Sequence, residues 1–235
     1  MTEILRVENA SKAYGEKEGR AWALRQVSAG IEEKDFVVIL GPSGSGKSTL
    51  LNLLSGLERA DEGAVFFAGD DLSRCNDQQL RRYRRLHTGF IFQEYHLIPN
   101  LTVRENIEIG RYLNKEGLEI DELVEELDIG SMEKRFPHEL SGGQQQRVAI
   151  ARALIKKPDI LFCDEATGAL DEGSGKQVLK IIQRLRRKYG LTVVFVTHNT
   201  SISQMANHII MLNSGKLVKE LHSLQPLDVG DIHWS

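Results

Sequence analysis

A glycine-rich loop at residues 41–49 constrains the fold of this chain more than any other feature of its sequence. An apolar run from Phe36 to Leu40 precedes the loop, and leucines at 50, 51, 53 and 54 follow it, which predicts a buried strand, a turn and a helix. Glycines permit positive φ and a close backbone approach, so successive N–H groups can surround phosphate oxygens at the helix N-terminus. We therefore expect a phosphate-binding loop formed by Gly41, Pro42, Ser43, Gly44, Ser45, Gly46, Lys47, Ser48 and Thr49.

Lys47 and Ser48 carry the side-chain chemistry of this loop. We expect the Lys47 ammonium to reach the β and γ phosphates as a point charge, and the Ser48 hydroxyl to coordinate Mg²⁺. The alternative is a glycine-rich turn that holds a lysine and a serine by chance. The strand and helix patterns on either side favour a nucleotide site with Mg²⁺.

A second apolar strand, predicted from Ile160 to Cys163, ends in the carboxylates of Asp164 and Glu165. Open α/β sheets place their ligand chemistry at the carboxyl ends of strands. We expect Asp164 to hold Mg²⁺, directly or through water, and Glu165 to act as the general base that orients and polarises the attacking water. An acidic surface turn is the alternative, and the phosphate loop earlier in the chain argues against it.

Alternating strand and helix patterns predict an α/β protein with a largely parallel sheet. Residues 192–196 form a further apolar strand, and residues 177–188 have helical periodicity. Before the loop the pattern is more strand-like, with Leu5 and Val7 alternating with polar residues and an apolar stretch at 22–27. These residues predict an antiparallel β portion joined to the parallel core.

Helical signals alone occupy the chain between Val103 and Leu140, which predicts a helical lobe over about residues 103–142. From residue 223 to 235 the periodicity is lost, and we expect a loosely held C-terminal tail. Residues 1–222 are then expected to form a single nucleotide-binding domain.

The composition of the chain limits the classes of partner that it is expected to bind and the compartment in which it is expected to lie. The 30 basic and 33 acidic side chains give a net charge of −3, so no overall basic field favours nucleic acid. No run approaches 18 apolar residues, and the N-terminus lacks the pattern of a signal peptide. Cys75 and Cys163 are the two cysteines, which suits a reducing compartment. We therefore expect a cytoplasmic protein that does not enter the membrane itself.

About a hundred residues after the phosphate loop comes Leu140-Ser141-Gly142-Gly143-Gln144. In that order the two motifs resemble the ATP-binding cassette (ABC) ATPases, and the order of motifs over residues 3–220 is similar to their nucleotide-binding domain. The resemblance implies a P-loop NTPase core with an antiparallel β portion and a helical lobe. It also implies a homodimer in the ATP-bound state, because the phosphate loop of one subunit and the Ser-Gly-Gly-Gln segment of another enclose ATP.

Ser141, Gly142 and Gly143 open a predicted helix that runs to Ile155. Under the resemblance a hydroxyl, backbone donors and a helix N-terminus face the γ-phosphate held by the other subunit. The alternative for Ser141 is an ordinary helix cap. The following run of residues 144–147, Gln-Gln-Gln-Arg, favours the resemblance.

Four more residues match functional positions of the family. Tyr14 stands where an aromatic residue stacks on adenine, with an edge-strand tyrosine as the alternative. Gln93 matches the glutamine that links the metal and the attacking water to the groove where a membrane partner docks. Asp171 resembles the loop that couples the two ATP sites across the dimer, with helix capping as the alternative. His198 follows a strand, where the family has a histidine that contacts the γ-phosphate.

Basic residues cluster just before the Gln93 strand, at positions 81, 82, 84 and 85. They could contact lipid headgroups or an acidic partner surface. A solvated helix face is the simpler interpretation.

The run from Gly89 to Thr102, followed by Glu105-Asn106, resembles the branch with macrolide-exporter (MacB-like) and lipoprotein-release (LolD-like) ATPases. That branch implies a separate transmembrane permease with a large extracytoplasmic domain, so membrane association occurs through the permease only, on the inner face of the cell membrane. Three positions depart from the family pattern without removing a catalytic group: Ala166, Ala169 and Asn199.

The leading function is therefore the ATP-hydrolysing subunit of an ABC transporter. A mechanotransmission or signalling subunit, as in cell division or peptide-antibiotic sensing, is the main alternative. ABC ATPases that act on DNA or ribosomes carry long coiled coils or two cassettes, and neither is found here. A nucleotide kinase would not need the Ser-Gly-Gly-Gln segment. The transported substrate and the direction of transport belong largely to the membrane subunit.

Overall fold

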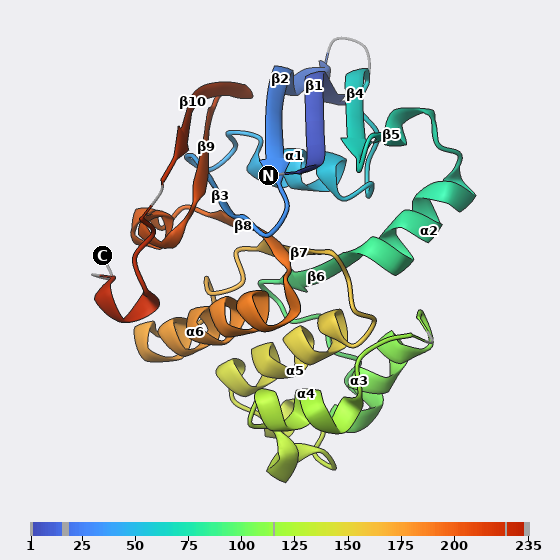
Figure 1. Ribbon diagram of the computed structural model, residues 1–235, viewed down its shortest axis with the longest axis vertical. Helices are drawn as coiled ribbons and strands as arrows, with labels where there is room; N and C mark the ends of the chain where they lie inside the picture. Colours follow the sequence, from blue (N-terminus) through green and yellow to red (C-terminus); the bar gives the residue numbers. More distant parts are fainter. Residues whose placement is uncertain (1, 16–18, 115, 224, 233–235) are drawn as a thin grey trace. The chain divides into compact units, whose positions relative to one another are not determined.

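The chain divides into two units in the computed structural model, which describes residues 2–15, 19–114, 116–223 and 225–232 (Figure 1). The first unit contains residues 1–84 and 192–235, and the second contains residues 85–191. Part of the predicted turn at 15–19 and part of the C-terminal tail lie outside the described residues.

An antiparallel sheet forms one part of the first unit. Its strand order is β2-β1-β4-β5, with Val7 of β1 opposite Ala29 of β2 and Val65 of β4. Leu5 and Val7 are buried, as their alternation with polar neighbours predicts, because one face of the sheet packs on the core. The predicted antiparallel β portion is therefore confirmed, in the strands β1 (Glu3–Tyr14), β2 (Ala21–Glu32), β4 (Glu62–Phe67) and β5 (Asp70–Asp71).

Parallel strands form the other part of the first unit. Strand β3 (Phe36–Leu40) pairs in parallel with β8 (Thr192–Thr197) on one side and with β9 (His208–Asn213) on the other. All residues of β3 and β8 are buried, which explains why both read as unbroken apolar runs. Strand β10 (Lys216–His222) closes this edge as an antiparallel neighbour of β9.

Short helices complete the first unit. Helix α1 (Lys47–Leu54) follows the glycine-rich loop and buries its leucines. Other helical elements of this unit are η2 (Leu72–Arg74), α2 (Asp77–His87, whose last three residues belong to the second unit), η5 (Thr200–Met205) and η6 (Val229–Asp231).

The expectation of a loosely held tail is wrong for its described part. Val229 and Ile232 are buried, at 1% and 2% exposure, and the Leu227 N–H donates to the Gln204 carbonyl at 2.9 Å. Two apolar side chains three positions apart can pack without producing the longer periodic pattern by which an element is predicted.

The second unit combines two parallel strands with helices. Strands β6 (Thr88–Phe92) and β7 (Ile160–Asp164) pair in parallel, with Phe92 opposite Asp164. The predicted helices are present as α5 (Gly142–Leu154), which packs on α3 and α6, and α6 (Glu172–Tyr189). Between residues 103 and 140 the described chain is helical or irregular, with α3 (Val103–Arg111), α4 (Ile120–Glu126), η3 (Gly130–Met132) and η4 (Pro137–Glu139).

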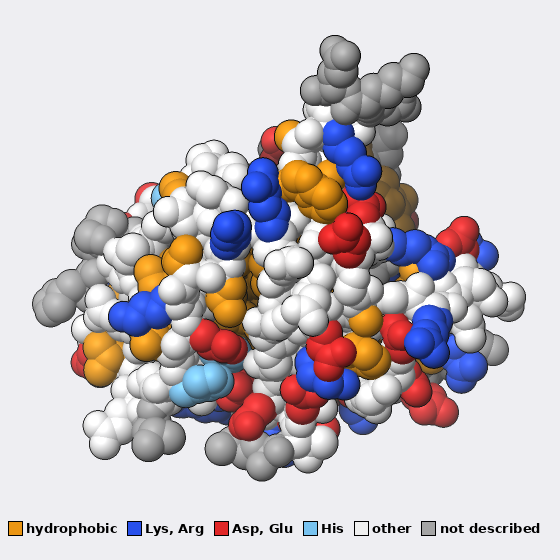
Figure 2. Space-filling model, turned by 90° about the horizontal axis from the view of Figure 1, so that it is seen from above, with side chains coloured by type: hydrophobic (Ala, Val, Ile, Leu, Met, Phe, Trp, Pro, Cys, Tyr) orange, Lys and Arg blue, Asp and Glu red, His pale blue; other side chains and the backbone are white. Residues whose placement is uncertain are grey.

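The distribution of charged side chains on the surface and the hydropathy of the helices agree with the composition. Basic and acidic side chains are intermixed on the face presented in Figure 2, in keeping with the small net charge. Across the described part of the chain, each helix is too short or too polar to cross a bilayer.

Candidate functional site

The phosphate loop lies in the first unit, between the carboxyl end of β3 and the first residue of α1. Gly46 caps α1 in a left-handed conformation with φ of 98°, and a Cβ there would lie 2.4 Å from the Ala23 carbonyl oxygen. Only glycine fits such a position, because an added methyl group would collide with backbone. The loop therefore brings its backbone to the N-terminus of α1, where anions are favoured.

Lys47 folds back over its own loop. Its ammonium donates to the carbonyl oxygens of Gly41 and Pro42, both at 2.9 Å, and the residue is only 7% exposed. A phosphate held by the loop N–H groups would be within reach of this charge, because the lysine is anchored by the same residues. The structure thus confirms the strand, loop and helix context on which the predicted role of Lys47 depends.

Tyr14 ends β1 and is tethered to the region around α1. Its hydroxyl donates to Glu58 Oε2 at 2.6 Å, and Thr49 Oγ1 lies 3.4 Å away. The other Glu58 oxygen accepts from Asn52 Nδ2 at 2.9 Å. Burial and the Glu58 hydrogen bond raise the pKa of the Tyr14 hydroxyl, so the phenol stays protonated and keeps donating. Tyr14 is 43% exposed, which leaves its ring accessible to a flat partner.

His198 follows β8 at the same edge as the phosphate loop. Leu40 and Thr197, the last residues of two neighbouring parallel strands, are paired, so the loop and His198 leave the sheet side by side. His198 is exposed. Asn199, which stands where the family commonly has aspartate, caps the 3-10 turn η5 by accepting from the Ser201 N–H at 2.8 Å.

Gln93, Asp164 and Glu165 lie together in the second unit. Because Phe92 pairs with Asp164, Gln93 and Glu165 are the first residues after two neighbouring parallel strands. A Cβ on Gly168 would lie 3.2 Å from Gln93 Nε2 and 3.3 Å from the Glu165 carbonyl oxygen. The amide side chain therefore lies against the turn that follows Glu165.

Glu165 has a left-handed backbone conformation, with φ of 47°. For a residue with a Cβ this conformation costs on the order of 1–2 kcal/mol, and such strain is concentrated at functional sites. The turn is held by the Gly168 N–H, which donates to the Glu165 carbonyl at 2.8 Å, and by the buried Gln146 side chain, which donates to the Ala166 carbonyl at 2.7 Å. These two hydrogen bonds hold the backbone of the turn in place and so fix the orientation of Glu165 within it.

Ser141 and Gln144 form a reciprocal cap at the start of α5. Ser141 Oγ accepts from the Gln144 N–H at 3.4 Å, and the Gln144 side chain accepts from the Ser141 N–H at 2.9 Å. A Cβ on Gly142 would lie 2.7 Å from the Tyr95 hydroxyl, and one on Gly143 would touch Ser174. The Ser-Gly-Gly-Gln segment is thus packed between the residues after Gln93 and the start of α6.

Asp171 caps α6. Its carboxylate accepts from the Ser174 N–H at 3.0 Å, and its hydrogen bonds to Ser174 hold the pKa of this carboxyl below its ordinary value. The capping alternatives considered for Ser141 and Asp171 are therefore real features of the fold. Capping accounts for the local geometry of these two exposed residues, while their roles toward a second copy remain predictions.

Arg152 was not singled out from the sequence. From α5 it donates to the carbonyl oxygens of Tyr95, at 2.9 Å, and of His96, and both of these residues have left-handed backbone, with φ of 57° and 49°. Burial lowers the pKa of the Arg152 guanidinium. A charge between the buried residues Ala151 and Ala153 is the sequence signal that could have identified it.

Glu58 and Asn52 were missed as well, because nothing in their neighbourhood distinguishes them from ordinary polar positions. In the basic cluster of α2, Arg84 donates to the Gly56 carbonyl at 2.5 Å, while Arg81, Arg82 and Arg85 are exposed. The cluster therefore behaves mostly as a solvated helix face, with one member holding the local fold.

Comparison with protein families gives a match to the ABC transporter family over residues 24–168. A putative ABC transporter ATP-binding protein of Mycoplasma genitalium is 48% identical over 215 residues, covering 90% of this chain and 46% of that protein. An uncharacterized ABC transporter ATP-binding protein of Methanocaldococcus jannaschii is 42% identical and matches over 92% of this chain and 98% of its own length. The chain spans about half the length of the first relatives it matches.

Other relatives are similar over part of their length. The macrolide export ATP-binding/permease protein MacB of Neisseria gonorrhoeae is 42% identical over 222 residues, which are 92% of this chain and 34% of that protein. Among solved structures, MJ0796, a bacterial ABC transporter cassette, has a TM-score of 0.84 at 37% identity in its dimeric structure, over 93% of this chain and 98% of that one. The dimeric structure of a post-hydrolysis state of the same cassette, bound to ADP and Pi, has a TM-score of 0.84 at 36% identity and covers the same shares of the two chains.

Proposed function

Because the chain belongs to the ABC transporter family, as an ATPase cassette, we propose that residues 1–222 act as one domain that hydrolyses Mg-ATP and drives a MacB-like or LolD-like membrane permease. The observation that carries the proposal is the arrangement at the ends of β6 and β7. There Gln93 lies against the turn that begins at Glu165, next to Asp164. An amide and two carboxylates at adjoining strand ends suit a metal and a water molecule better than they suit a structural turn.

Nucleotide binding is assigned to the first unit. The loop N–H groups and the N-terminus of α1 hold the phosphates, and Lys47 exchanges its carbonyl partners for phosphate oxygens. The exposed face of Tyr14, which Glu58 holds in place, stacks on adenine. The Tyr14 ring contributes affinity for the adenine base, and the loop contributes affinity for the negative charge of the phosphates.

The residues assigned to Mg²⁺ fit that ion by their chemistry. Ser48 offers a hydroxyl, Gln93 an amide oxygen and Asp164 a carboxylate, and Mg²⁺ prefers oxygen ligands of these kinds. When bound, the ion neutralises charge on the β and γ phosphates.

Hydrolysis is assigned mainly to the second unit. Glu165 accepts the proton of the attacking water, and the Gln93 side chain orients that water. The strained backbone at Glu165 and the two hydrogen bonds that support its turn fix the carboxylate in advance of the reaction. From the first unit, His198 contacts the γ-phosphate and responds to its loss.

A second copy of the chain completes each site. In this arrangement Ser141, Gly142, Gly143 and Gln144 face the γ-phosphate bound by the loop of the partner, with the N-terminus of α5 favouring the negative charge. The Ser141 cap supports this role, because it fixes the hydroxyl at the helix end. Asp171, at the start of the next helix, contacts the other copy and links the two ATP sites.

A first test measures phosphate release from ATP as the concentration of the purified chain is raised. We expect turnover that requires Mg²⁺, is lost with EDTA, and rises in specific activity as copies associate. A specific activity independent of concentration, in a chain that stays monomeric with ATP, would contradict the shared site. Absence of turnover with a membrane partner added would contradict the enzymatic assignment.

A second test identifies the permease. The tagged Glu165→Gln chain is incubated with ATP and detergent-solubilised native membranes, and captured proteins are identified by mass spectrometry. We expect a permease with a large extracytoplasmic domain, and the tagged Lys47→Ala chain is the matched control that fails to form the ATP-bound state. Recovery of soluble partners bound to nucleic acid would overturn the transport assignment.

A further inference from the structure

Three side chains with metal-ligand chemistry meet at one end of the β9–β10 hairpin, in the first unit. His208 is the first residue of β9 and pairs with His222, the last residue of β10. Glu220 is two residues before His222, so its side chain points to the same face of the strand. Directly opposed residues of antiparallel strands have Cβ atoms about 4.5–5.5 Å apart, which is suitable for sharing an ion.

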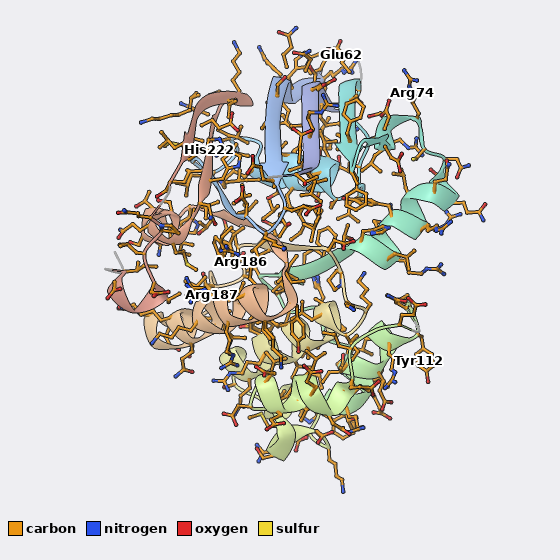
Figure 3. All side chains as sticks on the ribbon, in the orientation of Figure 1. Glu62, Arg74, Tyr112, Arg186, Arg187 and His222 are labelled. Atoms are coloured by element: carbon orange, nitrogen blue, oxygen red, sulfur yellow. The ribbon has the colours of Figure 1, made fainter. Side chains whose placement is uncertain are left out.

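The distances confirm that the three side chains are neighbours. His208 Nε2 lies 2.8 Å from Glu220 Oε1, and the centroids of the two imidazole rings are 4.2 Å apart. One potential ligand atom from each residue lies within 4.8 Å of those of the others. Figure 3 marks His222 at this end of β10, and Figure 1 shows β9 and β10 side by side.

Exposure differs across the three residues in a way that suits a site open on one side. The His208 side chain is fully buried, that of Glu220 is 32% exposed, and His222 is exposed. Nε2 is the His208 nitrogen that contacts Glu220, so it is the ring nitrogen that would bind the ion.

We propose that His208, Glu220 and His222 form a binding site for a divalent transition-metal ion, with Zn²⁺ as the best match. Two imidazoles and one carboxylate are a known set of three Zn²⁺ ligands, which leaves a fourth position for water or another molecule. Zn–N and Zn–O bonds of about 2.0–2.2 Å require the ligand atoms to converge, which the Glu220 and His222 side chains, both accessible to solvent, do by rotating. Imidazole ligands select Zn²⁺, Ni²⁺ or Cu²⁺ over Mg²⁺.

The site is distinct from the nucleotide site. His208 pairs with Val37 near the beginning of β3, whereas the phosphate loop follows Leu40 at the carboxyl end of the same strand. The proposed ion therefore lies at the opposite edge of the parallel strands. It would add a bridge between the last residues of β10 and the first residue of β9, and its binding does not depend on ATP or on the proposed function.

The test measures metal binding directly. The full chain is treated with EDTA, returned to buffer with excess Mg²⁺ and no nucleotide, and titrated with Zn²⁺ by calorimetry. Co²⁺ is then added as a spectroscopic probe, because its visible absorption reports the ligand geometry. We expect one Zn²⁺ per chain with micromolar or tighter affinity, a rise in the melting temperature with Zn²⁺, and a Co²⁺ spectrum typical of four ligands.

Three variants make the test specific. His222→Ala and Glu220→Gln should each weaken Zn²⁺ binding at least tenfold and remove the melting-temperature rise. His138→Ala, at an exposed histidine in the second unit, is the matched control and should bind as the wild type does. Because His222 is exposed, its loss should hardly change the melting temperature of the metal-free chain. Absence of stoichiometric Zn²⁺ binding, or binding that survives both variants, would overturn the proposal.

Discussion

The two units carry different kinds of predicted site residues. In the first unit the predicted phosphate site is mainly backbone, a loop that Gly46 allows to pass closely over β2 and the helix N-terminus that follows it, with the Lys47 side chain folded over the loop. The second unit uses side chains, with Gln93, Asp164 and Glu165 placed at paired strand ends. A backbone site suits an anion of fixed shape, whereas side chains at strand ends suit the handling of a proton and a metal. Under the proposed function, most of the nucleotide binding is therefore assigned to the first unit and most of the chemistry to the second.

Each unit also has a cation that holds two backbone carbonyls. Lys47 binds the carbonyls of Gly41 and Pro42 in the loop that follows β3. Arg152 binds those of Tyr95 and His96 in the loop that follows β6. Lys47 is a flexible point charge that can leave its carbonyls for phosphate, while the planar Arg152 is a fixed clamp. Substitution at the first should therefore change binding, and substitution at the second should change turnover.

The largest effect is expected for Glu165→Gln. This change removes the general base but keeps the shape of the side chain, so the turnover number should fall by roughly 100-fold or more. ATP affinity should remain within about threefold of wild type, because binding is assigned to the first unit. Turnover is measured by phosphate release and affinity by equilibrium binding of a fluorescent ATP analogue.

Glu172→Gln is the matched control for that variant. Glu172 is an exposed carboxylate in the first turn of α6, paired with Lys176 at 2.8 Å. The Glu172→Gln variant should hydrolyse ATP at the wild-type rate. Wild-type turnover in Glu165→Gln would show that the chemistry does not depend on this carboxylate.

Lys47→Ala should break binding. Loss of charge-assisted hydrogen bonds to phosphate should weaken ATP binding by roughly 50-fold, in line with about 1.5–3 kcal/mol for such a bond. Equilibrium binding of ATP measures the effect. The exposed Lys219, on β10, gives the control variant Lys219→Ala, which should bind normally. Unchanged affinity in Lys47→Ala would remove the first unit from its proposed role.

Tyr14 and Glu58 test whether the ring is positioned in advance. Tyr14→Ala should weaken ATP binding roughly tenfold, because a base stacked on an aromatic ring contributes about 1–3 kcal/mol. Glu58→Gln should weaken it less, by about threefold, since a neutral acceptor holds the phenol less firmly. Competition between ATP and a triphosphate without a base measures both. Equal affinity for the two ligands in the wild type would show that the ring is not used.

The smallest effect is expected for Arg152→Lys. A lysine cannot hold two carbonyls in the planar geometry of arginine, so the turnover number should fall by about threefold while ATP affinity is unchanged. Steady-state kinetics separate the two quantities. Arg111→Lys, at an exposed arginine paired with Glu119, is the control. A loss of affinity instead of turnover would contradict the assignment of this loop to the chemical step.

Much of the site could be predicted from the sequence because it depends on local patterns. The loop at 41–49 and the carboxylates of Asp164 and Glu165 are fixed by strand ends that the apolar runs identify. The hydrogen bonds that hold Tyr14 and the loop after β6 could not be predicted in this way. Tyr14 and Glu58 are 44 positions apart in the sequence, and Arg152 and Tyr95 are 57 apart. Such contacts depend on the tertiary fold, and no periodicity within either segment reports them.

Other differences between the predicted site and the structure come from single residues that serve two roles. Ser141 and Asp171 match functional positions of the family, and in the structure they cap helices. The sequence cannot separate the two roles, because serine and aspartate at a helix start serve both. The packing of Val229 and Ile232 was missed because two apolar residues are too few to define an element.

The most direct test of the division between the units is sedimentation of the Glu165→Gln chain with Mg-ATP, alone and combined with Ser141→Arg. We expect a dimer for Glu165→Gln with ATP and a monomer with ADP. We expect a monomer for the double variant, with ATP affinity unchanged, because Ser141 acts on the nucleotide of the other copy. A double variant that still forms the ATP-dependent dimer, or that loses ATP binding as Lys47→Ala does, would show that Ser141 does not act across a dimer.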